Sequence, residues 1–294
     1  MLEIPESSTI ADQLNHTVKS KTILNVYANS SPHKFAWYFG DPKDYSAALS
    51  GRRIDNARAN AGQVEIFAQD YRILLSDGVN IRYFDVGEKR PSKHQLLIEF
   101  KDSSSLLCSV QMYGGLWVFK DGENHNPYYH VAKEKPTPLE NGFSPEYFQQ
   151  LLKASDLKTL SAKGFLATEQ RIPGLGNGVL QDILFYGAIH PKRVMWTLSD
   201  SELYTLFWSI KNTLANMTTN GGRDTERDLF ASFGRYKTIM SKKNLGKPCP
   251  ICGTTIKKET YMGGSIYFCE DCQRKGENPL EVNPCSEPYR YFYI

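Results

Sequence analysis

The sequence contains no long run of apolar residues, and it is poor in cysteine, with six in 294 residues. A helix that crosses a bilayer needs about 18 or more consecutive apolar residues, so we expect no transmembrane segment and no membrane partner. The first ten residues, MLEIPESSTI, lack a basic segment followed by an apolar core. We therefore expect no secretory signal and a cytoplasmic protein. Six cysteines in a chain of this length do not make a disulfide scaffold.

A large excess of charge of one sign is also absent, because 35 Lys and Arg residues stand against 32 Asp and Glu residues. The basic residues are nevertheless unevenly spread, with seven of them and no acidic residue from Arg235 to Lys258. This stretch includes Lys242, Lys243 and Lys257. A basic run of this kind is either a solvated face or a surface that neutralises several phosphates at once. The charge pattern alone leaves both interpretations open.

The first 135 residues are dominated by short β-rich segments between turn residues. A helix is expected after Pro5, and its apolar residues Ile10, Leu14 and Val18 recur at helical spacing. Eight strands are expected next, over residues 22–27, 34–39, 64–67, 71–75, 79–84, 95–100, 106–112 and 116–119. Many short strands with this punctuation predict a β-sandwich or a barrel in residues 1–135.

The pattern changes at the proline-containing linker 136–138, and helical periodicity follows. We expect helices over residues 145–154, 161–168, 178–185, 199–217 and 225–233. Ser199 and Glu202 have the spacing of a capping box at the start of one of them. The sequence thus predicts an α+β protein in which a helical domain, residues 144–245, follows the β-rich domain. A small separate unit at 246–275 and a tail at 276–294 complete the chain.

The strongest local pattern consists of two cysteine pairs near the C-terminus. Cys249 and Cys252 form one pair, and Cys269 and Cys272 form the second pair after sixteen further residues. Four thiolates at this spacing match one structural, tetrahedral Zn²⁺, and the intervening length suits a β-hairpin. A redox dithiol is the alternative, but two pairs at this spacing favour zinc. A unit of about 30 residues also needs a metal for stability, because it cannot build its own core.

A glycine-rich turn precedes the helix expected at 178–185. Its residues are Arg171-Ile172-Pro173-Gly174-Leu175-Gly176-Asn177-Gly178. Gly176 and Asn177 form a tight turn that aims backbone N–H groups and a side-chain amide at one point, as helix N-termini that hold phosphate do. An asparagine at the start of a helix is also a common cap. The motif alone does not decide between the two roles.

Taken together, these pieces resemble the family of formamidopyrimidine-DNA glycosylase and endonuclease VIII. The opening Glu3-Ile4-Pro5-Glu6 is similar to the stretch after that family's initiator residue. The segment from Gly174 to Pro191 resembles its helix–two-turn–helix, and Gly221-Gly222 stands where a paired glycine is expected before a short helix. The segment from Pro248 to Gln273 is similar to its zinc finger. The resemblance covers nearly the whole chain in the same order.

The resemblance implies an N-terminal β-sandwich, a helix–two-turn–helix domain and a C-terminal zinc β-hairpin. It also implies a monomer that binds bent double-stranded DNA with a damaged base flipped out, and that is associated with the nucleoid in a bacterium. In the family, the amine of an N-terminal proline attacks C1′ of the sugar, a Schiff base forms, and strand cleavage follows base loss. The assisting glutamate corresponds to Glu3, and Glu6 is a second candidate. Asn177 corresponds to a residue that contacts phosphates.

The chain departs from the family at the attacking group. The proline is replaced by Leu2. A bulky leucine normally prevents removal of the initiator, so we expect Met1 to be retained. Its amine then lies one residue, about 3.8 Å of Cα spacing, from the usual place. The Met1 amine remains a candidate for imine formation, but it must bend back beside Glu3.

Cations that the family uses at the site are missing as well. The family's lysine on a hairpin corresponds to Gln63, and the arginine near the tip of its zinc finger falls at Gly264. The strand that carries lesion-probing residues reads Gln111-Met112-Tyr113-Gly114, so that Gln111 stands for an arginine. The expected DNA-contacting residues are Asn177, Gly176, Gln63, Gln111, Tyr113, Lys242, Lys243, Lys257 and Lys258.

Three losses together predict that the lyase step has been abandoned or rebuilt, and they leave three hypotheses. The first is a DNA glycosylase of base excision repair in which Glu3 activates water or protonates the leaving base. The second is a non-catalytic protein that binds abasic, kinked or otherwise damaged duplex DNA. The third is a zinc-stabilised module that binds protein. The retained glutamates, Asn177 and the four cysteines favour DNA binding.

Overall fold

The computed structural model describes residues 1–273 and 275 of the chain. These residues fall into two compact units. Unit 1 comprises Met1–Glu134 and Met217–Tyr236, and unit 2 comprises Lys135–Asn216 and the residues from Lys237 onward. The segment Met217–Tyr236, expected in the helical domain, clusters with the β-rich residues. The expected tail at 276–294 lies outside the described residues.

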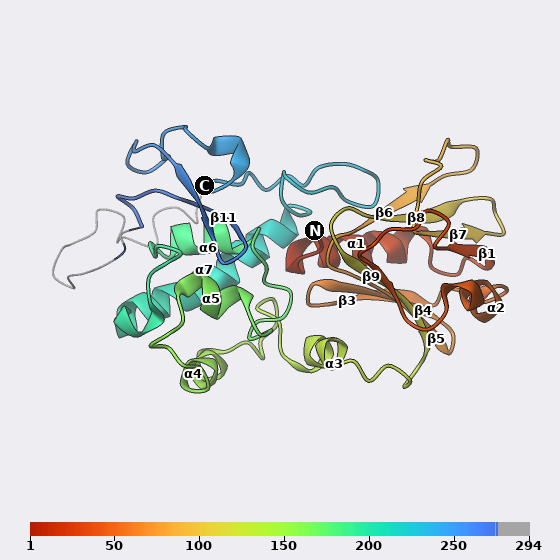
Figure 1. The fold of residues 1–294 in the computed structure, drawn as a ribbon, viewed down its shortest axis with the longest axis horizontal. Helices are drawn as coiled ribbons and strands as arrows, with labels where there is room; N and C mark the ends of the chain where they lie inside the picture. The colour runs from red at the N-terminus through yellow and green to blue at the C-terminus, as the bar shows by residue number, and fades with distance from the viewer. Residues whose placement is uncertain (274, 276–294) are drawn as a thin grey trace. The chain divides into compact units, whose positions relative to one another are not determined.

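Unit 1 contains a β-sandwich of two sheets (Figure 1). Its strands are β1 Ile23–Ala28, β2 Ala36–Tyr38, β3 Asn56–Asn60, β4 Gln63–Ala68, β5 Tyr71–Ser76, β6 Val79–Phe84, β7 Leu96–Phe100, β8 Ser105–Val110 and β9 Gly114–Lys120. One sheet has the order β1-β7-β8-β6, and the other has the order β2-β9-β5-β4-β3. Ile66 and Ile73 of one sheet and Ile98 of the other are buried in the same apolar core, which confirms a sandwich.

Strand β3 was not expected from the sequence. Its residues Asn56–Asn60 contain two alanines and two asparagines and no β-branched or aromatic side chain, so intrinsic preference gives no strand signal. Pairing with β4 supplies the missing stability, because Asn56 lies opposite Phe67 and Asn60 lies opposite Gln63 across an antiparallel register. The short helices η1 Pro42–Asp44, α2 Tyr45–Leu49 and α3 Pro127–Glu134 were also not expected.

Helix α1, Ile4–Thr17, packs against β3 and β4. It begins earlier than expected, with Glu3 in extended conformation as its N-cap and Pro5 in the first turn. Proline suits this position because the first N–H groups of a helix have no intrahelical partner. The Ser7 hydroxyl donates to the carbonyl of Ala61, which fixes the first turn against the β3–β4 hairpin. Ile10 and Leu14 face the core, as the periodicity predicted.

The helix expected at 225–233 is wrong. These residues form turns, and Arg227 and Phe233 face each other in an isolated antiparallel bridge. The carboxylate of Asp228 accepts hydrogen bonds from the N–H groups of Phe230 and Ser232 at 3.0 and 2.8 Å. An aspartate that bonds its own downstream backbone in this way stabilises a turn in preference to a helix.

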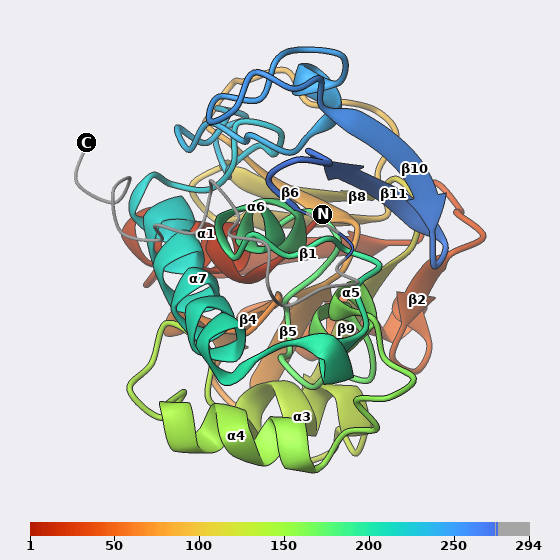
Figure 2. The same ribbon diagram turned by 90° about the vertical axis from the view of Figure 1, so that its left-hand side faces the viewer.

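Unit 2 is helical apart from one β-hairpin. Its elements are α4 Pro145–Lys153, α5 Ala162–Ala167, α6 Leu180–Tyr186, η2 Met195–Thr197, α7 Asp200–Thr219, which continues into unit 1, η3 Lys242–Asn244, β10 Lys257–Tyr261 and β11 Gly264–Phe268. Figure 2 shows β10 and β11 as adjacent antiparallel arrows. The capping box at α7 is confirmed, because the Glu202 carboxylate accepts from the Ser199 N–H at 2.8 Å and the Ser199 hydroxyl accepts from the Glu202 N–H at 3.3 Å.

The α+β fold expected from the sequence is confirmed, with a β-sandwich, a set of helices and a cysteine-bearing hairpin. Among the described residues, none of the helices combines the length and the apolar character that crossing a membrane requires.

Candidate functional site

The two candidate catalytic glutamates are buried at the start of α1. Glu3 is 3% exposed and Glu6 is 4% exposed. A buried carboxylate needs a cation or several donors. Arg223, also in unit 1, supplies both. Its Nη1 lies 3.3 Å from a carboxylate oxygen of Glu3, and its Nε and Nη2 donate to Glu6 at 2.9 and 2.8 Å.

The backbone around Arg223 is adapted to this contact. The N–H of Arg223 donates to Glu6 Oε1 at 3.1 Å, and Gly222 before it has a φ of +93°. A Cβ at Gly222 would lie 3.3 Å from Glu6 Oε1, so both space and conformation favour glycine there. Burial alone would lower the pKa of Arg223, but the carboxylates of Glu3 and Glu6 outweigh burial and raise it. Arg223 is therefore a permanent cation between two carboxylates.

The first two residues of the chain have different environments. The amine of Met1 forms an ion pair with Glu226, N to Oε2 2.5 Å. Leu2 is buried, and its N–H donates to the carbonyl of Asp77 at 2.7 Å. The ion pair thus engages the Met1 amine with a carboxylate in this structure. The position of the family's proline is thus a core position here.

Three further candidates of unit 1 lie on or beside its strands. Gln63 begins β4, and its Oε1 is buried without a hydrogen-bond partner among the described residues. Gln111 is exposed in the turn before β9. Tyr113 is half-buried and stacks on Trp37, with ring centroids 5.7 Å apart. Burial, Asp77 and Glu3 each raise the pKa of the Tyr113 hydroxyl, so the Tyr113 ring lies in the electrostatic neighbourhood of Glu3.

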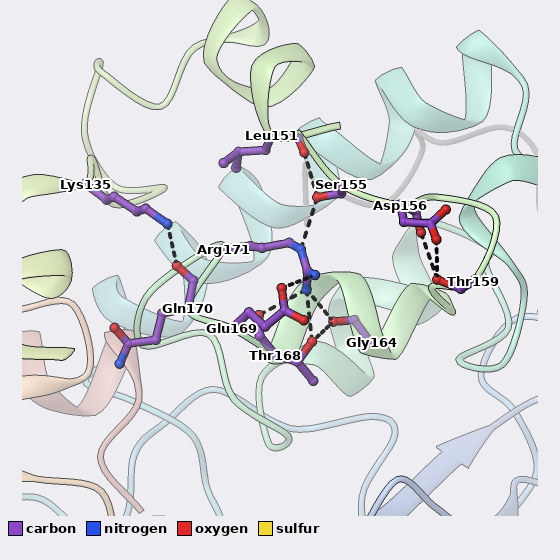
Figure 3. A network of polar contacts seen from close by, with 10 residues as sticks. All are labelled: Lys135, Leu151, Ser155, Asp156, Thr159, Gly164, Thr168, Glu169, Gln170 and Arg171. Carbon is purple, nitrogen blue, oxygen red and sulfur yellow. Dashed lines mark hydrogen bonds and ion pairs between the residues drawn. The ribbon is translucent and has the colours of Figure 1, made fainter. Parts of the chain in front are cut away.

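Arg171 anchors the start of the glycine-rich turn in unit 2 (Figure 3). Its Nε donates to the Ser155 hydroxyl at 3.0 Å, and its Nη1 donates to the carbonyl and the hydroxyl of Thr168 at 3.2 and 2.9 Å. Nη2 also pairs with Glu169 at 2.6 Å. These bonds satisfy acceptors at the end of α5. They hold the strained residues Glu169 and Gln170, whose φ angles are 56° and 46°.

Asn177 connects the turn to the hairpin within unit 2. Its Nδ2 donates to the carbonyl of Ser265 in β11 at 3.0 Å. Gln181 in α6 reinforces this contact, because its Nε2 donates to the same carbonyl at 3.1 Å and its Oε1 accepts from the Tyr267 N–H at 3.0 Å. Gly176, directly before Asn177, is half-buried. The amide of Asn177 thus bonds the hairpin in this structure.

A lysine from α5 lies where the resemblance expects an arginine on the hairpin. Lys163 is buried, and its Nζ donates to the carbonyl of Tyr261 at 2.6 Å. A Cβ at Gly264 would lie 3.2 Å from this Nζ and 3.3 Å from Asn177 Oδ1. Burial lowers the pKa of Lys163. A side chain at Gly264 would therefore crowd an amine that already lies beside Asn177.

The four cysteines form one cluster. Their sulfur atoms all lie within 4.8 Å of one another, and Cys252 and Cys269 are 3.3 Å apart. Sulfur atoms at this separation can surround one metal ion, since zinc–sulfur bonds of about 2.3 Å place sulfurs nearly 4 Å apart. Burial opposes ionisation of Cys252, but hydrogen bonds to Thr254 bring its pKa down to about 7, whereas burial raises that of Cys269 to about 12. Cys108 lies apart in the sandwich core, and Cys285 is outside the described residues.

The four candidate lysines are exposed on two elements of unit 2. Lys242 and Lys243 lie in η3, and Lys257 and Lys258 lie in β10. Lys257 pairs with Glu270 at 2.5 Å. Exposure leaves these side chains accessible to phosphates, and their contact with nucleic acid remains a prediction.

Comparisons with known proteins agree with this geometry. A crystal structure of the Lactococcus lactis protein Fpg with DNA that contains an abasic site has a TM-score of 0.79 at 21% identity, over 92% of this chain and 99% of that one. The formamidopyrimidine-DNA glycosylase of Bacillus cereus strain ATCC 10987 is 27% identical over 280 residues, 93% of this chain and 99% of that protein. The formamidopyrimidine-DNA glycosylase of Bacillus subtilis strain 168 is 27% identical over 288 residues, which cover 94% of this chain and 100% of that protein. Over nearly its whole length the chain is thus similar to formamidopyrimidine-DNA glycosylases in sequence and to Fpg in fold.

No family model matches the chain. Two residues at its sites were missed from the sequence, Arg223 and Lys163. Arg223 is 217 residues from Glu6 along the chain, and no local pattern joins them. Its position directly after Gly221-Gly222 was the available signal. Lys163 stands in an otherwise apolar helix, and a charged residue at such a buried position was the signal there.

Proposed function

We propose that this chain is a DNA glycosylase that removes a damaged base from duplex DNA and has lost the lyase step of its family. The observation that carries the proposal is Glu3, a buried carboxylate 3.3 Å from Arg223, retained beside a leucine that replaces the attacking proline. Such a carboxylate can activate water for attack at C1′. The paired amine of Met1 supports loss of the imine.

Unit 2 supplies the proposed grip on DNA. Asn177, the hairpin and the exposed lysines offer amide and ammonium donors for phosphate oxygens. Within the proposal, the four cysteines hold one structural Zn²⁺, which keeps β10 and β11 folded. The partner is double-stranded DNA with a damaged nucleotide, bound by a monomer. The names of the relatives and the DNA in the neighbouring structures support this partner.

The proposal is tested with duplexes that each carry one damaged nucleotide, beginning with the formamidopyrimidine form of guanine opposite cytosine. Base release is scored by strand cleavage after hot alkali, and lyase activity by cleavage without alkali. We expect release without lyase activity, and a loss of at least about 100-fold in Glu3→Gln. The matched control Glu123→Gln alters an exposed glutamate of the same unit and should retain full activity.

Borohydride trapping on an abasic duplex tests the lost step directly. We expect no covalent product, because Leu2 replaces the attacking proline and the Met1 amine is engaged by Glu226. Capture of the protein through Met1 would contradict loss of the lyase step while leaving the glycosylase intact.

A non-catalytic binder of damaged duplex is the second candidate. The observation that favours it is the absence of a cationic side chain at Gln63 and Gly264. Failure of every damaged duplex to lose its base, combined with a mobility shift that prefers abasic over intact DNA, would select this candidate. A mobility shift without such preference would exclude both.

A further inference from the structure

We propose that Arg223 is a positioning residue for base excision, one that holds Glu3 as an anion so that Glu3 acts as a base toward water and not as an acid toward the leaving base. The inference rests on the proposed function and decides between the two roles open to Glu3. It concerns an arginine that has no counterpart among the residues through which the family was recognised in the sequence.

The geometry of the guanidinium separates the two glutamates. Glu6 occupies the side formed by Nε and Nη2, and it also accepts the N–H of Arg223. These three bonds fix the plane of the guanidinium. Glu3 meets the remaining Nη1 at 3.3 Å, a longer contact. Glu6 therefore anchors the arginine, and Glu3 receives its charge with a looser bond.

The negative group that competes most directly with Glu3 for this cation is Glu6, which bonds the same guanidinium. Glu226 is negative, but it pairs with the amine of Met1. Burial raises the pKa of Asp77 and of Tyr113, which favours the neutral form of each. Because both the guanidinium and Glu3 are buried, their attraction is screened less than it would be at the surface. The contact with the Arg223 guanidinium thus favours the carboxylate form of Glu3.

A carboxylate at this position suits a hydrolytic step. The oxygen of a water molecule bonds to C1′ as the C1′–N bond breaks, and the electron pair of that bond leaves with the base. Glu3 takes a proton from the attacking water, and solvent supplies a proton to the departing base. No oxidation or reduction occurs, and no amine of the protein is consumed.

The test compares the pH dependence of base release between pH 4 and pH 9 in the wild type, Arg223→Met and Arg223→Lys. The substrate is the formamidopyrimidine-guanine duplex, and the rate of base release is measured under single turnover.

A carboxylate that acts as a base must be ionised, so the wild-type rate should fall only on the acidic side of the pH range. Without the cation a buried carboxylate protonates more readily. The acidic midpoint is the pH at which the rate of base release falls to half on the acidic side. In Arg223→Met we expect this midpoint to rise by about one pH unit or more. The rate should then fall about tenfold or more at pH 5 and change little at pH 9. In Arg223→Lys the acidic midpoint should stay within about half a pH unit of the wild-type value.

Arg72→Met is the matched control, because Arg72 is also a buried arginine of unit 1 and pairs with Asp121. The acidic midpoint of Arg72→Met should equal that of the wild type. Equal loss at every pH in Arg223→Met would show a merely structural role and overturn the inference, as would a wild-type rate that falls toward alkaline pH. If Arg223→Met does not fold, the variant Glu6→Gln tests the inference in its place. Removal of the competing negative charge of Glu6 should lower the acidic midpoint. An unchanged midpoint in Glu6→Gln would overturn the inference. A wild type that releases no base instead contradicts the proposed function.

Discussion

The two units differ in how far they keep the residues that the resemblance assigns to function. In unit 1 the carboxylates Glu3 and Glu6 are present, but they face Arg223, and the attacking proline is a buried leucine. In unit 2 the glycine turn with Asn177 and the cysteine cluster are intact, and Lys163 lies beside the glycine that replaces an arginine. The residues proposed to grip DNA are thus retained, whereas those that the resemblance assigns to the reacting sugar are altered.

Removal of the proposed Zn²⁺ should give the largest effect, and the effect should be confined to unit 2. Chelation or Cys272→Ser is expected to unfold β10 and β11, because metal binding contributes about 10 kcal/mol or more to the folding of small zinc units. Hydrogen exchange should show loss of protection in Lys257–Tyr261 with protection retained in the sandwich. Cys108→Ala, outside the cluster, is the control. Protected hairpin amides in the chelated protein would contradict a metal-dependent fold.

Glu6→Ala should destabilise unit 1 next most strongly. It leaves the buried Arg223 without its bidentate partner, which costs about 3–5 kcal/mol when one half of a buried pair is removed. Urea denaturation followed by tryptophan fluorescence measures the change. A cost below about 1 kcal/mol would mean that Arg223 does not depend on Glu6.

Asn177→Ala should have an intermediate effect in unit 2. It removes the hydrogen bond to Ser265, which costs about 1 kcal/mol of stability, and it should weaken binding of an abasic duplex about tenfold. Mobility shifts against the exposed control Asn141→Ala measure the affinity. Unchanged affinity would favour a module that binds protein.

Lys258→Ala should have the smallest effect. Lys258 is exposed, so stability should change by less than about 0.5 kcal/mol, while the salt dependence of DNA binding should lose about one unit of slope. Lys153→Ala, on the exposed part of α4, is the control, and both are titrated between 50 and 200 mM salt. A slope equal to that of the wild type would place Lys258 outside the interface.

What could be predicted from the sequence differs between local and distant relationships. The cysteine cluster and the capping box at Ser199 depend on residues close in sequence, and both appear in the structure. The contact between Arg223 and Glu6 spans 217 residues and has no local pattern. The helix expected at 225–233 failed because apolar spacing outweighed the turn chemistry of Asp228 in the prediction. Strand β3 has no intrinsic signal, and its partner β4 determines its conformation.

The close approach at Gly264 has a consequence for protein engineering. Putting an arginine back on the hairpin looks like a one-letter repair, yet its first carbon would press on the Lys163 ammonium at 3.2 Å. The arginine would also bring a second positive charge close to the Lys163 ammonium. An arginine at position 264 therefore requires the Lys163 side chain to shift, so the substitution is best measured with and without a change at Lys163.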